Sequence, residues 1–397
     1  MGTTEWIVVI LVVGARLALP LTIPYFPLVG VVACLILDAI DQSVFQQFPA
    51  IPLDGYQSYD KSLDIYYLAI TYLSTMRNWS NPVAFKMSWF LYYYRLVGVV
   101  AFELSQVRAI LFIFPNTFEY FFIFYEAVRL RWNTARMGLW TVVVATALIW
   151  VFIKLPQEWW IHIAQLDMTD FIKETLFGVS TDASWGEAIS NRPWVLVLAI
   201  VIVAVIGYIG YWIVTRKAPP GDHRPSLKAD PLPAECRGAE LYKTVRATER
   251  VFDRALAEKV VLLGLVSVIF AQILKVQLGN LGVLVVVAIF VAVNAAASQW
   301  LARRGRGWQS VGTELAGMAL VNAAIVAVML LLERVLGVID YPAAKGTTLF
   351  FVFLVTVLTV LFDRYHTVMR ARAVLATGGA PEGPGTADST AMPGSAH

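Results

Sequence analysis

Long apolar runs recur along the chain, and they constrain the fold more than any other feature of the sequence. A helix that crosses the hydrocarbon core of a bilayer needs about 20 predominantly apolar residues. Only 15% of the 397 residues are charged, whereas soluble domains have roughly a quarter, and the mean hydropathy is +0.66. We therefore predict an all-α, polytopic transmembrane helical bundle. The apolar runs lie at 83–104, 111–128, 194–214, 260–274, 281–301, 315–332 and 349–362.

The runs predict eleven spans, or ten if the first two form one unit. The almost wholly apolar stretch 6–40 is too long for one span and short for two, and Pro20, Pro24 and Pro27 interrupt it. We interpret it as two short spans at 6–21 and 25–41, and a single span with a re-entrant piece is the alternative. The other spans are expected at 61–77, 83–105, 107–128, 138–154, 193–215, 257–276, 280–302, 312–335 and 346–364.

Polar segments divide the chain further. The segment 155–192 is rich in Trp and other large apolar residues among polar ones, which predicts an outer interfacial amphipathic segment. The charged stretch 240–259 is expected to extend the following span into the cytoplasm as a helix that could dock a protein partner. The Gly-, Ala-, Pro- and Ser-rich tail predicts disorder. We thus expect a polar-cored half at 1–154, the outer loop 155–192, a span at 193–215, a cytoplasmic segment at 216–259, a charge-poor scaffold at 260–368 and a disordered tail at 369–397.

The distribution of basic residues predicts the orientation. Lys and Arg concentrate in alternate loops, and such loops face the cytoplasm. The resulting topology places the carboxyl terminus in the cytoplasm, in the cell membrane. The side of the amino terminus stays open, and Arg16, which lies near an inner end only with eleven spans, favours the outside. The basic residues that fix the topology are Arg129, Arg131, Arg136, Arg216, Lys217, Arg224, Lys228, Arg303, Arg304, Arg306, Arg364, Arg370 and Arg372.

Two acidic pairs form the first candidate site. Asp38 and Asp41 are three residues apart and share a helix face, as do Asp60 and Asp64, with Lys61 beside them. The topology places both pairs at outer helix ends joined by one loop, where they could converge. Paired carboxylates there suggest cation binding, proton exchange or a divalent Mg²⁺ or Mn²⁺ site. Charges that simply face water are the alternative.

Ionisable residues in the middle of two spans form the second candidate site. Arg95, Asn116 and Glu119 fall at similar depth in an antiparallel hairpin, and Pro115 frees a backbone carbonyl at the same level. We expect Arg95 to pair with Glu119, and Glu103 is a further candidate nearer the outer end. Intramembrane charges are costly and indicate function by default, although a structural ion pair is the alternative.

Several absences narrow the function. We place none of the four histidines inside a span, which argues against a histidine–zinc membrane enzyme. The chain has no phosphate-binding Gly-x-x-x-x-Gly-Lys motif, and its net charge of +3 is too small to suggest nucleic acid. After residue 193 the span centres contain almost no charge, and we interpret Asn294 and Asn322 as residues that join helices.

These features favour a transporter or channel-like protein with a charged midplane site, an acidic outer vestibule and a lipid or small-ion substrate. The first alternative is an enzyme that uses a divalent cation at Asp38, Asp41, Asp60 and Asp64 to act on a lipid-linked phosphate-containing substrate at the outer interface. The second is a non-catalytic membrane subunit of a complex. We assign no family from these motifs.

Overall fold

The computed structural model describes residues 2–46, 48, 56–166, 168–232, 252–273, 279–304, 311–336 and 345–376. Every regular element in these residues is a helix, which confirms the all-α prediction. Six stretches among them are long and apolar enough to cross a membrane. They are Thr3–Thr22, Leu139–Ile163, Pro193–Arg216, Arg254–Ile273, Asn280–Arg303 and Phe350–Ala373.

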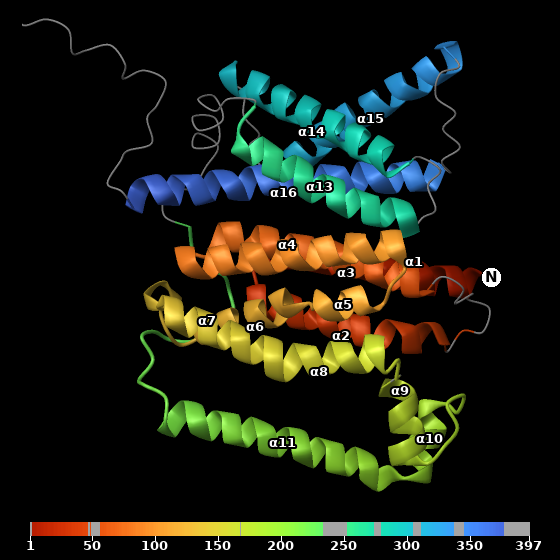
Figure 1. Cartoon of the computed structure of the whole chain (residues 1–397), viewed down its shortest axis with the longest axis vertical. Coiled ribbons are helices and arrows are strands. Elements are labelled where there is room, and N and C mark those ends of the chain that lie inside the picture. The colour runs from red at the N-terminus through yellow and green to blue at the C-terminus, as the bar shows by residue number, and fades with distance from the viewer. Residues whose placement is uncertain are drawn as a thin grey trace, which may run out of the picture.

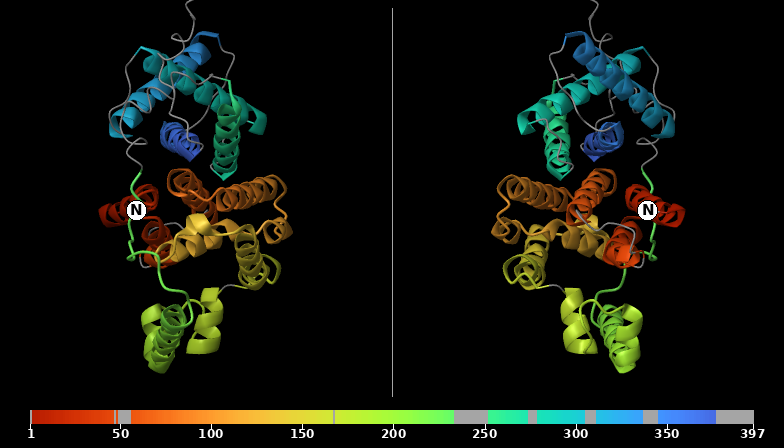
Figure 2. Two further views of the ribbon diagram at one scale, coloured as in Figure 1. Left: turned by 90° about the vertical axis from the view of Figure 1, so that its left-hand side faces the viewer. Right: turned by 90° about the vertical axis from the view of Figure 1, so that its right-hand side faces the viewer.

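The helices stack in layers along the long axis of the molecule, and most of their axes run side by side (Figure 1). The amino-terminal helices form the middle layer, the carboxyl-terminal helices cover one side of it, and the helices from the centre of the chain cover the other (Figure 2). This layering places the candidate residues of the amino-terminal half inside the stack.

The amino-terminal apolar stretch forms two separate helices, as the interpretation with two spans predicts. α1 covers Thr3–Ala18, the short helix η1 covers Leu19–Thr22, and α2 covers Pro27–Gln46. The chain reverses at η1 because Pro20 and Pro24 favour turn conformations there. Gly30 allows this tight packing, since a Cβ at that position would come within 2.9 Å of the backbone of Ile23.

The middle layer is completed by α3 (Tyr56–Asn78), α4 (Pro82–Ser105), α5 (Ala109–Ile113) and α6 (Thr117–Arg129). α3 is largely buried between neighbouring helices, and Tyr72 of α3 stacks on Tyr92 of α4 with ring centroids 4.6 Å apart. The span expected at 107–128 is thus interrupted, because α5 and α6 are separated at Phe114–Asn116.

A continuous helical stretch follows, longer than the span expected at 138–154. It comprises α7 (Leu139–Leu148), η3 (Ile149–Lys154), α8 (Leu155–Glu158) and η4 (Trp159–Ile163). The segment after it forms the short helices α9 (Met168–Phe171), η5 (Ile172–Phe177) and α10 (Trp185–Asn191). Residues of η5 and α10 form a small apolar cluster with Val195. α11 (Pro193–Arg216) then crosses the molecule alone, and no residue of its most apolar stretch is buried, which suits contact with lipid.

The carboxyl-terminal layer contains α13 (Arg254–Ile273), α14 (Asn280–Arg303), α15 (Val311–Leu336) and α16 (Lys345–Ala376). Asn294 donates to Asn322 Oδ1 over 2.5 Å, and Asn322 donates to Thr356 Oγ1 over 2.7 Å. These bonds join α14, α15 and α16, so the prediction that the two asparagines connect helices is confirmed.

The basic loops gather at one end of the helices. Arg129 contacts Lys228 and Asp230, Asn133 contacts Asp222, and the backbone of Ala229 reaches Tyr25 in the first turn of the chain. The segment 164–192 lies at the opposite end (Figure 1). Two of the loops that the basic residues assign to the same side of a membrane, 129–136 and 216–230, are therefore in contact at one end of the fold.

Some predictions concern residues outside the described part of the chain. They include the helix at 240–251, the tail 377–397 and the side chains of Asp60 and Lys61.

Candidate functional site

The guanidinium of Arg16 lies among three carboxylates. Its Nη1 donates to Asp41, and its Nη2 donates to Asp38 and, over 3.1 Å, to Asp64. Asp41 is fully buried, whereas the side chains of Asp38 and Asp64 are 29% and 36% exposed. We call these four residues the Arg16 cluster.

Three helices contribute to the Arg16 cluster. Asp38 and Asp41 project from the same face of α2, as their spacing predicts, and Asp64 comes from α3. Arg16 is the one buried residue of α1, so its side chain is the main link of α1 to the interior. Tyr66 of α3 fastens the same region by donating to the carbonyl of Leu17 over 3.0 Å.

Asp38, Asp41 and Asp64 therefore converge as expected, whereas the side chain of Asp60 lies outside the described residues, and both helices extend further than the expected spans. α2 continues to Gln46 and α3 begins at Tyr56, so Asp38 and Asp64 each lie about two turns inside the helices. Sequence reasoning used Arg16 only to orient the chain. An arginine within an apolar run is itself the signal that was missed, because charge is costly there.

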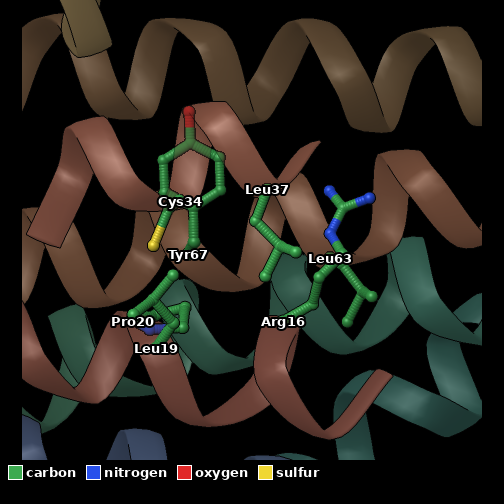
Figure 3. A pocket seen from close by; sticks show the side chains of 7 residues that line it. All are labelled: Arg16, Leu19, Pro20, Cys34, Leu37, Leu63 and Tyr67. Carbon is green, nitrogen blue, oxygen red and sulfur yellow. The ribbon is translucent and has the colours of Figure 1, made fainter. Parts of the chain in front are cut away.

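A small cavity of about 10 Å³ borders the Arg16 cluster, which is roughly the space of one water molecule. Figure 3 shows Cys34 and Pro20 on one side of it and Arg16 on the other. The lining is mainly apolar and comes from η1, α2 and α3 as well as Arg16. Its residues are Arg16, Leu19, Pro20, Cys34, Leu37, Leu63 and Tyr67.

The interruption between α5 and α6 forms the second site. The carbonyls of Ile113 and Phe114 accept hydrogen bonds from Tyr94 and Arg95 of α4, each over 2.9 Å. Gly98 allows α4 to approach so closely, because a Cβ there would come within 2.1 Å of the side chain of Phe114. α4 thus satisfies the backbone groups that the break at Pro115 exposes.

Glu158 supports the same break from the Leu139–Ile163 helix. Its Oε1 accepts from the backbone N–H of Asn116 over 3.1 Å. The carboxylate also lies 3.6 Å from Lys154 and 3.0 Å from His162. These three residues repeat at intervals of four and so share one helix face. Sequence reasoning assigned Glu158 and His162 to a loop and placed every histidine outside the spans, but His162 and His366 lie within the candidate spans Leu139–Ile163 and Phe350–Ala373.

Glu119 lies at the start of α6 and is only 5% exposed. Its Oε2 accepts from the Asn116 side chain over 3.1 Å, whereas Oε1 is buried without a hydrogen-bond partner. Two other buried oxygens at the break, Asn116 Oδ1 and Thr117 Oγ1, also have no partner. The break therefore leaves three buried oxygen atoms, one each from Glu119, Asn116 and Thr117, without a hydrogen-bond partner.

The expected ion pair between Arg95 and Glu119 is not formed among the described contacts. Arg95 binds the Phe114 carbonyl instead, and its Nε has no partner. Glu119 interacts electrostatically with Lys154 and Glu158, and also with Asp38 of the Arg16 cluster. The two predicted sites are thus neighbours across α2 and α6. Glu103 lies two turns beyond Arg95, towards the end of α4, away from the break.

No group of three or more His, Cys, Asp or Glu in the described residues is arranged to hold a metal ion. In the Arg16 cluster the guanidinium takes the central position that a cation would need. What the arrangement offers chemically is a buried set of charges and unused oxygens, suited to binding and releasing a small ion or polar group.

Fold and site together define an all-helical protein with apolar helices long enough for a membrane and with charged residues inside its amino-terminal half. Comparisons of the chain with protein-family models, with curated proteins and with solved structures found no match.

Proposed function

We propose that the protein is a multi-pass membrane transporter that binds its substrate or a coupled ion at the break between α5 and α6. The cell membrane, with the carboxyl terminus in the cytoplasm, is the proposed location. The single observation that supports this best is the interrupted helix itself, with the buried, unpaired carboxylate oxygen of Glu119 beside the interruption. Interrupted helices in membranes are tolerated where they line a binding site or water-filled cavity.

The surroundings of the break support the same proposal. Arg95, Lys154 and Glu158 place both signs of charge around it. Such residues are expensive within a bilayer and commonly mark substrate or ion pathways. The Arg16 cluster adjoins this site, because Asp38 interacts electrostatically with Glu119, and the side chains of Asp38 and Asp64 are partly exposed.

The enzyme alternative requires the aspartates to bind a divalent cation, but Asp38, Asp41 and Asp64 all bind Arg16. The subunit alternative depends on the helix proposed at 240–259, and 240–251 lies outside the described residues. No observation supports either alternative as strongly as the break beside Glu119 supports the transporter.

Access to the break from the two sides of the membrane tests the proposal without knowledge of the substrate. Cys34 and Cys236 are first replaced by serine, and Thr117→Cys is introduced. Impermeant thiol reagents are then applied to right-side-out and inside-out vesicles. A transporter exposes its site alternately, so we expect labelling from both sides.

Ser267→Cys on α13 is the matched control, because Ser267 is as buried as Thr117 and its hydroxyl also has no partner. It should label from neither side. Labelling of Thr117→Cys from one side alone would favour an enzyme at one interface, and labelling from neither side would favour a closed structural subunit.

A further inference from the structure

Glu119 differs from the other buried carboxylates in the described residues. Besides Glu119, the buried carboxylates there are Asp41, Glu126, Glu158 and Glu314. Asp41 pairs with Arg16, Glu126 with Arg129 over 2.6 Å, Glu158 with Lys154, and Glu314 with Arg364. Glu119 alone among the five has no cation within 4.0 Å, and one of its oxygens has no hydrogen-bond donor.

The charged groups that face Glu119 do not neutralise it. α2 contributes Asp38, which is negative and itself bound to Arg16. The Leu139–Ile163 helix contributes Lys154 and Glu158, and Lys154 donates to Gln157 over 2.8 Å and pairs with Glu158. α2 also contributes the buried thiol of Cys34, which is not a cation, and Arg95 of α4 donates to the Phe114 carbonyl at the break. Each cation near Glu119 is therefore engaged elsewhere.

The neutral form of the carboxyl group fits this environment. An ionised carboxylate buried without a paired cation is strongly disfavoured, and nearby carboxylates disfavour it further. Asn116 donates to Oε2, so the proton belongs on Oε1. Asn116 Oδ1 and Thr117 Oγ1 are buried acceptors without partners in the same stretch of chain, and either could receive the hydrogen directly or through water.

We propose that Glu119 is protonated in this conformation and that it is the proton-carrying residue, so that the coupled ion of the proposed transporter is a proton. This inference rests on the proposed function. The proton enters from the aqueous phase, binds one oxygen of Glu119 and leaves again as H⁺, and the partly exposed Asp38, which interacts electrostatically with Glu119, is the proposed side of entry.

Covalent labelling with dicyclohexylcarbodiimide tests the protonation state directly. This apolar reagent adds to protonated carboxyl groups in apolar surroundings and spares ionised, paired ones. The purified full chain is labelled in detergent over a range of pH, and modified peptides are measured by mass spectrometry. Glu119 should be labelled at least tenfold more than Glu126, Glu158 and Glu314, and the labelling should decline as the pH rises.

Glu119→Gln should abolish this labelling, and Glu314→Gln, a change to a buried glutamate in the carboxyl-terminal layer, should retain it. Infrared difference spectra provide a second readout, since a buried protonated carboxyl band should be present in the wild type and absent from Glu119→Gln. Equal labelling of the paired glutamates, or absence of both the label and the infrared band, would overturn the proposal. If Thr117→Cys is still labelled from both sides in that case, the transporter proposal stands and only the proton is excluded.

Discussion

Replacement of Arg16 by methionine is expected to destabilise the protein more than any change to its acidic partners. Methionine fills a similar volume and remains compatible with an apolar helix, but it removes the cation shared by Asp38, Asp41 and Asp64. At least one carboxylate is then left buried without this partner. Removing one member of a buried ion pair costs about 3–5 kcal/mol, so we expect a loss of at least about 3 kcal/mol.

The burial of each aspartate predicts how much stability is lost when that aspartate, and not Arg16, is replaced. Asp41 is fully buried, so Asp41→Asn should cost about 1.5–3 kcal/mol, the contribution of a hydrogen bond to a charged group. The side chains of Asp38 and Asp64 are partly exposed, and water can replace their bond to Arg16. Asp64→Asn, at the most exposed position, should therefore cost less than about 1 kcal/mol.

Unfolding in mixed detergent micelles, followed by circular dichroism, measures these differences. Arg136→Met is the control, because Arg136 is exposed in a short turn, and it should change the stability by less than about 0.5 kcal/mol. Arg16→Lys should retain part of the stability, since it keeps the charge but loses the forked geometry. A loss below about 1 kcal/mol for Arg16→Met, or a larger effect for Asp64→Asn than for Asp41→Asn, would refute the reasoning.

Three further predictions follow from the fold. Single cysteines at Ser58 and Ala218 should react with impermeant reagents from opposite sides of the membrane, and reaction from the same side would contradict the proposed topology. Mg²⁺ and Mn²⁺ should not raise the melting temperature, because Arg16 occupies the centre of the acidic cluster; a stabilisation lost in both Asp38→Asn and Asp64→Asn would instead favour the metal-dependent enzyme. Asn322→Val should cost about 1 kcal/mol in the same unfolding assay, since it removes two buried interhelical bonds, whereas Thr215→Val on the exposed face of α11 should have no effect.

The positions of most helices could be predicted from the sequence because span length is set by bilayer thickness. The expected spans at 83–105, 193–215 and 280–302 agree with α4, α11 and α14 to within one residue at each end. The predicted helix ends are wrong where a polar residue does not mark the end of a helix. The Leu139–Ile163 helix continues beyond Lys154 because Lys154, Glu158 and His162 satisfy one another along one face.

The partners of the charged residues could be predicted less well. Counting from the loop places Arg95 and Glu119 at the same depth, but depth does not fix the direction in which a side chain leaves its helix. In the structure Arg95 points to the freed carbonyl of Phe114, whereas Glu119 meets Asn116. Rotation about the helix axis depends on tertiary packing, here the close contact of Gly98 with Phe114, and the sequence pattern alone contains no measure of it.

The buried charged residues of the two halves of the chain differ in how they are paired. In the carboxyl-terminal layer the buried charges are paired, with Lys259 2.6 Å from Asp363 and Glu314 bound to Arg364. Such pairs fix the positions of helices and leave no charge to exchange with a ligand. Glu119 lacks a partner of this kind, and it sits where the helix is interrupted and where α4 and the Leu139–Ile163 helix supply the missing backbone contacts. Because an unpaired buried carboxylate reduces stability, its presence beside a break supports the proposed binding role of this site.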